Sequence, residues 1–165
     1  MNFTDDIKNF LSRIYGHERH NSYVYSAISN YLNVLGYKNL SKYYEEWSQH
    51  EIEHSMLVRD FCNSNDIFID MSIPIIGLDI NLQLLPLTHF SIVTIDVEAE
   101  TTDLYNELLE MGVSAGNGFI KKFAYDFLQE QQEETDKANT LFARVQNIGD
   151  SKTFLQLFDN TFKTD

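Results

Sequence analysis

Six polar side chains interrupt stripes of apolar residues that recur at helical spacing along the sequence. Each of the six falls on the face of its stripe that should point into a protein core. A buried charge without a partner costs several kcal/mol, a large share of the stability of one domain. The stripes hold no Lys or Arg to neutralise the four carboxylates, whereas two divalent cations would balance them. We therefore predict a metal site formed by Glu18, Glu51, His54, Glu98, Gln131 and Glu134.

The pair Glu51 and His54 indicates which metals such a site would bind. Residues three apart lie on one face of a helix, as two ligands of one ion must. A neutral imidazole beside carboxylate oxygens suits iron, manganese or zinc and excludes an all-oxygen calcium site. A lone Glu-x-x-His pair arises often by chance, but a core-facing glutamate on each of four helices is more specific. The alternative is that the stripes are displaced by one residue and the glutamates are solvated.

Four long helices are needed to position these side chains. The apolar spacing predicts them over residues 4–35, 40–63, 89–114 and 119–146. Gly36 stands where a left-handed residue would end the first helix. The short link after it makes the first two helices antiparallel neighbours. With two prolines and seven glycines among 165 residues, the composition also favours an all-α fold.

Two further segments complete the organisation of the chain. Residues 66–87 hold both prolines, Pro74 and Pro86, and show no sustained helical period. We expect a long crossover along the bundle, with its isoleucines and leucines buried against a second subunit. Residues 152–162 form a short amphipathic helix, which is too brief to be stable alone and must dock on the bundle.

Charge and composition exclude several classes of partner. A net charge of −13 and a pI near 4.6 argue against binding to nucleic acids or to anionic membrane surfaces. The acidic surplus serves either solubility or the attraction of cations. Cys62 is the only cysteine, which excludes an internal disulfide and a cysteine-rich zinc site. The sequence shows neither a signal peptide nor a long apolar run, so we expect a cytoplasmic protein.

One ordered pattern runs through the chain, namely Glu18…Tyr25…Glu51-x-x-His54…Glu98…Gln131-x-x-Glu134. This pattern resembles that of the bacterial non-haem ferritin family over nearly the whole length. The equal separations of Glu18 from Glu51 and of Glu98 from Gln131 both fit the family without a gap. The resemblance implies a ferritin-like up-down-down-up four-helix bundle, with the crossover between the second and third helices. It implies one domain over residues 1–165, with the bundle over about 4–147 and a short fifth helix over about 151–162.

The resemblance also assigns roles to the pattern residues. One iron ion would be held by Glu18, Glu51 and His54. The other would be held by Glu51, Glu98 and Glu134, with Glu51 bridging the two ions. Gln131 would hydrogen-bond to a ligand or to a bound oxygen species. Tyr25 would hydrogen-bond to Glu98 or another ligand and lend an electron, and the alternative for it is a packing role in the core.

Two differences from related di-iron proteins indicate which branch of the family this chain resembles. Related di-iron proteins carry a second Glu-x-x-His, where this chain has Gln131-x-x-Glu134. This difference favours a ferritin whose second iron is held loosely and moves on to storage. Ile52 stands where a bacterioferritin places its haem-ligating methionine, so no haem is expected.

A third iron site is a further implication, because many bacterial ferritins hold one through additional glutamates. Glu130 and Glu133 match two of those positions, but His50 occupies the third. The alternative is a solvated acidic face. The remaining histidines show no useful spacing and are expected at the surface; they are His17, His20 and His89.

The function implied by the resemblance is iron storage with ferroxidase activity. Two Fe²⁺ ions would meet O2 or H2O2 in the bundle, and the ferric product would be stored inside a shell of twenty-four identical subunits. One alternative is a non-storing di-iron protein that acts as a peroxidase or iron carrier. Another is a helical interaction protein that has lost its metal.

Overall fold

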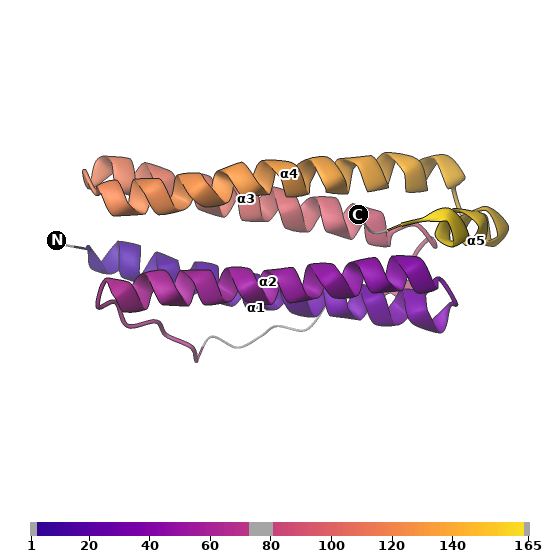
Figure 1. Cartoon of the computed structure of the whole chain (residues 1–165), viewed down its shortest axis with the longest axis horizontal. Coiled ribbons are helices and arrows are strands. Elements are labelled where there is room, and N and C mark those ends of the chain that lie inside the picture. The colour runs from indigo at the N-terminus through magenta and orange to yellow at the C-terminus, as the bar shows by residue number, and fades with distance from the viewer. Residues whose placement is uncertain (1–2, 73–80, 164–165) are drawn as a thin grey trace.

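Four long helices and a short fifth one form the computed structural model, which describes residues 3–72 and 81–163 (Figure 1). The helices are α1 Asp5–Val34, α2 Lys38–Ser64, α3 Phe90–Ser114, α4 Gly118–Ile148 and α5 Lys152–Thr161, and a short 3-10 helix, η1, covers Leu82–Leu84. No strand occurs in these ranges. Helices α1 and α4 run in one direction and α2 and α3 in the other, which confirms the predicted bundle (Figure 1). None of the described helices combines the length and apolar character of a bilayer span.

Local sequence signals explain where several helices begin and end. Thr4, Asn117 and Ser151 each accept a hydrogen bond from a backbone N–H of the first turn that follows. Such caps satisfy N–H groups that have no partner within the helix. Gly36 has a φ of 92° and follows Leu35, the C-cap residue of α1, as the sequence predicts for a left-handed residue at the helix end.

The apolar core is divided into two clusters at opposite ends of the bundle. One cluster joins the α1 residues that precede Glu18 to the α2 residues that follow His54, together with the adjoining ends of α3 and α4. The other cluster joins the opposite ends of the same four helices. The polar residues of the predicted site therefore lie in the middle of the bundle, with apolar packing on both sides.

The described ends of the crossover are anchored to the bundle by alternate residues. Ile67 and Ile69 are buried and belong to the first apolar cluster. Phe68 and Leu84 point outward, with exposed fractions of 90% and 81%. Pro74 lies outside the described residues, and the expected burial of the crossover against a second subunit stays a prediction.

Helix α5 docks across the end of the bundle where α1 turns into α2 (Figure 1). Leu155 is fully buried in the second cluster. The buried carboxylate of Asp159 accepts a hydrogen bond from the Leu40 N–H at 2.8 Å, close to the start of α2. These contacts provide the docking that so short a helix requires.

Candidate metal centre

The six predicted site residues converge in the middle of the bundle, one or two from each long helix. Their exposed fractions are all 6% or less, so each side chain is enclosed by protein. No Lys or Arg in the described part of the chain forms an ion pair with their carboxylates. The contributing residues are Glu18 on α1, Glu51 and His54 on α2, Glu98 on α3, and Gln131 and Glu134 on α4.

Glu18, Glu51 and His54 form the first group with metal-ligand geometry. Their ligand atoms all lie within 4.8 Å of one another. His54 Nδ1 is 3.8 Å from Glu18 Oε2 and 3.8 Å from Glu51 Oε2. Neither of these two buried oxygens has a hydrogen-bond donor when both carboxyls are ionised. Two orphaned carboxylate oxygens facing an imidazole fit an iron ion, because a cation would satisfy all three groups.

Glu98 is held by two donors from neighbouring helices. The Tyr25 hydroxyl donates to Oε1, and the Gln131 amide donates to Oε2 and also, at 3.3 Å, to the Glu98 carbonyl. The resemblance described above predicts Tyr25 beside Glu98 or another ligand, and Gln131 beside a ligand or a bound oxygen species. The structure brings all three side chains together at these positions.

Burial keeps protons on the carboxyls of this centre. It raises the pKa of Glu51 to about 8, with the charges of Glu98 and Glu134 acting in the same direction. It raises the pKa of Glu98 to about 7, again with help from Glu134. The pKa of Glu18 is also raised well above its ordinary value, by burial and by Glu51. Protons therefore substitute for the missing positive charge, and a bound cation would displace them.

A second group lies on the side of the site that is open to solvent. It combines His50, His54, Glu130 and Glu134, with ligand atoms again within 4.8 Å of one another. His50 Nε2 lies 3.2 Å from Glu130 Oε1, and His50 Nδ1 lies 3.0 Å from Glu134 Oε1. His50 and Glu130 are each more than 40% exposed. Glu133 is exposed and belongs to neither group among the described residues.

His54 faces both groups through different ring nitrogens. Its Nδ1 points toward the Glu18 and Glu51 oxygens, whereas its Nε2 lies 3.4 Å from Glu130 Oε1. Burial lowers the pKa of His54, but the carboxylates around it outweigh burial and the net shift is upward. The hydrogen bond with Glu134 raises the pKa of the neighbouring His50 as well.

Tyr105 is a site residue that the sequence did not reveal. Its fully buried hydroxyl donates to Glu18 Oε1 at 2.6 Å. A sequence signal did exist, because Tyr105 follows Glu98 by two helical turns, as Tyr25 follows Glu18. Among nine tyrosines, that spacing could not be separated from core packing.

The prediction that His17 lies at the surface is wrong. Its side chain is only 10% exposed, and its Nε2 lies 2.8 Å from Thr101 Oγ1. Asn21 donates to the same hydroxyl at 3.0 Å, while the hydroxyl donates to the Val97 carbonyl. Burial, with help from nearby positive charge, lowers the pKa of His17 to about 4. His17 therefore finds its partner on α3, which no local pattern in the sequence specified.

The sequence of this chain matches a known protein family. Residues 8–148 match the family model of the ferritin-like domain. No curated protein sequence matches the chain at a significant level.

Solved structures of ferritins superpose on nearly the whole chain. An open-pore ferritin from the hyperthermophilic archaeon Archaeoglobus fulgidus has a TM-score of 0.85 at 20% identity, and the match covers 96% of both chains. An iron-soaked variant of the ferritin PmFTN has a TM-score of 0.91 at 19% identity, over 97% of this chain and 100% of that one. A humanized archaeal ferritin reaches 0.89 at 22% identity, over 99% and 100%. At such identities these structures establish the fold, and because the family model spans most of the sequence, the chain belongs to the ferritin family.

Proposed function

We propose that this chain is an iron-storage protein with ferroxidase activity. In this proposal it oxidises Fe²⁺ with O2 or H2O2 at a dinuclear site and stores the ferric product in a multi-subunit shell. The observation that carries the proposal is the set of four buried glutamates and His54 with no Lys or Arg paired to them in the described residues. Such a set is costly without a cation and favourable with two.

The residues divide between two positions for the substrate ions. Glu18, Glu51 and His54 would hold one Fe²⁺ ion, and Glu51, Glu98 and Glu134 the other. Tyr25 and Gln131 would keep Glu98 oriented through their hydrogen bonds to its two oxygens. Carboxylate ligands favour Fe³⁺ over Fe²⁺ because they supply negative charge, so the site promotes the loss of an electron from each ion. We propose that it works without haem.

The half-exposed group beside the centre supports a route between the buried ions and the outside. His50 and Glu130 are partly exposed, whereas His54 and Glu134 are buried, and His54 belongs to both groups. We propose a third metal position here, formed by His50, His54, Glu130 and Glu134. In this version Glu133 is not a direct ligand, because it lies outside the group.

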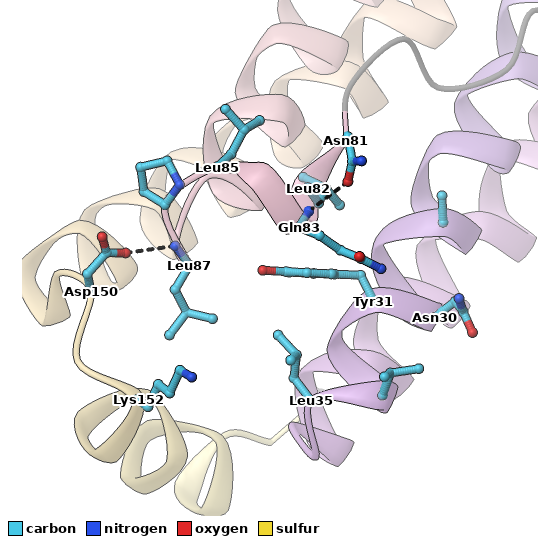
Figure 2. Close-up of a pocket in the computed structure, with 13 residues that line it drawn as sticks. Asn30, Tyr31, Leu35, Asn81, Leu82, Gln83, Leu85, Leu87, Asp150 and Lys152 are labelled. Atoms are coloured by element: carbon cyan, nitrogen blue, oxygen red, sulfur yellow. Dashed lines mark hydrogen bonds between the residues drawn. The ribbon is translucent and has the colours of Figure 1, made fainter.

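A pocket far from the metal centre supports assembly into a shell. The pocket has a volume of about 1070 Å³ and lies between the C-terminal half of α1, residues 81–87 and the start of α5 (Figure 2). Tyr31 and Leu35 line one side, and Leu87 lies opposite, where its N–H donates to Asp150 at 2.7 Å (Figure 2). Val34 also lines it and is 75% exposed, and Leu35 is 42% exposed. We propose that a second copy covers these apolar groups in a shell of twenty-four subunits.

The experiment that tests the activity removes two ligands at once. Glu51→Ala combined with His54→Ala should abolish rapid Fe²⁺ oxidation, measured by ferric absorbance after aerobic addition of iron. The control is Glu53→Ala, an exposed glutamate on the same helix, which should oxidise Fe²⁺ at the wild-type rate. Equal rates in the double variant and the wild type would reject the ferroxidase proposal.

Electron microscopy of the iron-loaded wild-type protein separates storage from the alternatives. Hollow particles with dense cores would support storage. Rapid oxidation by a monomer or dimer without cores would instead favour a non-storing peroxidase or iron carrier. An anaerobic Fe²⁺ titration that found no binding would favour a metal-free interaction protein.

We also propose a cytoplasmic location. The single cysteine, Cys62, is buried and unpaired, which is consistent with a reducing compartment such as the cytoplasm.

A further inference from the structure

Tyr25 and Tyr105 occupy equivalent positions on two antiparallel helices. On α1, Tyr25 lies two helical turns after Glu18. On α3, Tyr105 lies two helical turns after Glu98. Each hydroxyl crosses to the other helix, so that Tyr25 donates to Glu98 and Tyr105 donates to Glu18. The carboxylate of each helix is thus held by a tyrosine of the other.

The two carboxylates differ in the oxygen that remains free. Both oxygens of Glu98 accept hydrogen bonds, one from Tyr25 and one from Gln131. In Glu18 only Oε1 is engaged, by Tyr105 at 2.6 Å, whereas Oε2 has no donor when Glu18 and Glu51 are ionised, as metal ligands are, and lies 3.8 Å from His54 Nδ1. Tyr105 therefore selects the oxygen that Glu18 can offer to a metal ion.

We propose that Tyr105 is a positioning residue that holds Glu18 as a one-oxygen ligand of the ion shared with Glu51 and His54. The proposal rests on the proposed metal centre. In this proposal a hydroxyl on α3 determines how Glu18 binds a metal ion whose ligands lie on α1 and α2. Without this hydroxyl, both Glu18 oxygens would be free to turn toward the ion.

Packing fixes the Tyr105 hydroxyl at this point. The side chain is fully buried, and its ring stacks on Phe127 with a centroid separation of 4.5 Å and an interplanar angle of 13°. The Phe127 ring in turn contacts the His54 ring, 5.5 Å away and edge-on. The variant Tyr105→Phe keeps the ring and this stacking and removes only the donor.

An anaerobic titration with Co²⁺ tests the proposal, because Co²⁺ is stable to oxidation and its visible absorption reports coordination number. The intensity of these bands falls as oxygen ligands are added. In Tyr105→Phe we expect weaker bands for the first equivalent of Co²⁺, since Glu18 can bind through both oxygens. Loss of a group that orients a metal ligand typically also weakens binding about 10- to 100-fold. We expect a loss in that range for the first ion.

The matched control is Tyr44→Phe. Tyr44 is equally buried and donates to or accepts from Thr94 at 2.7 Å, so its variant also loses one buried hydroxyl hydrogen bond. Thermal unfolding followed by circular dichroism is used first to check that both variants are folded. Wild-type spectra and affinity in Tyr44→Phe, with changes in both for Tyr105→Phe, would support the proposal.

Two results would overturn the proposal in distinguishable ways. If the wild type bound Co²⁺ and Tyr105→Phe gave the same spectrum and affinity, the positioning role would be rejected while the metal centre stood. The same conclusion would follow if Tyr44→Phe changed the spectrum as much as Tyr105→Phe did. If the wild type bound no Co²⁺ at all, the metal centre itself would fail, and the role of Tyr105 with it.

Discussion

Replacing Glu51 by glutamine should stabilise the metal-free protein. Burial raises the pKa of Glu51 from 4.5 to about 8. Between these values the folded state holds a proton that the unfolded state has released, so stability falls as pH rises through this window. A pH of 7 lies about 2.5 units above the pKa of the carboxyl in the unfolded chain. At about 1.4 kcal/mol per unit, keeping the carboxyl protonated in the folded state costs on the order of 3 kcal/mol.

Glutamine removes this cost because it has the same shape and no proton to lose. We expect Glu51→Gln to raise the free energy of unfolding by up to about 3 kcal/mol near pH 7 and by much less near pH 5. For a chain of this size, that gain corresponds to about 6–12 °C in the midpoint of thermal unfolding. The same change should weaken metal binding, since Glu51 is the carboxylate shared by both proposed positions.

Urea unfolding of chelator-treated protein at about pH 5.5 and about pH 7.5, at one protein concentration, measures the effect. The wild type should lose stability between these pH values, and the variant should lose less. Glu53→Gln, on the exposed side of the same helix, should behave as the wild type, within about 0.5 kcal/mol. An unchanged pH slope in Glu51→Gln, or a variant less stable than the wild type near pH 7.5, would refute the reasoning.

Two further substitutions test the packing of the bundle and the proposed third metal position. A Cβ at Gly112 would lie 2.7 Å from Ile120 Cγ2, so Gly112→Ala should destabilise the protein by about 1–3 kcal/mol in urea unfolding. Gly118→Ala has open space around its Cβ and should not do so. His50→Ala should leave the first rapid Fe²⁺ oxidation near the wild-type rate but remove one bound Zn²⁺ ion in a calorimetric titration. Glu133→Ala, outside the group, should retain that ion, and the reverse result would restore Glu133 as a ligand.

The sequence predicted the helices and the buried carboxylates for one physical reason. A helix repeats every 3.6 residues, so a polar residue such as Glu98 within an apolar stripe must face the core if the stripe does. Capping residues mark where helices begin, and the glycine that follows α1 marks where that helix ends. The identity of each core-facing charge could therefore be read from residues close to it in the chain.

Partners on other helices could not be read in this way. Tyr105 donates to Glu18, and His17 forms a hydrogen bond with Thr101. Both contacts join α1 to α3, so they depend on how these two helices are rotated relative to each other. A tyrosine in a stripe packs equally well with or without a partner for its hydroxyl, so its type carries little information. Glu133 shows that a match to a family position does not by itself fix where a side chain points. That match suggests Glu133 as a ligand of the third metal site, but its side chain is exposed to solvent.

The contrast between the two proposed iron positions explains how a ferritin could release iron from one of them. At the position of Glu18, Glu51 and His54, the two free oxygens have no competing donor once both carboxyls are ionised. At the other position, Glu98 already accepts hydrogen bonds at both oxygens. Glu134 lies 3.0 Å from His50, and the hydrogen bond with Glu134 raises the pKa of that histidine, which favours its protonated form. Each Fe²⁺ ion at the second position would therefore compete with donors for its ligands and bind more weakly, so an anaerobic titration should show two affinities. Equal affinities would mean that the hydrogen bonds to Glu98 and Glu134 do not weaken the second position.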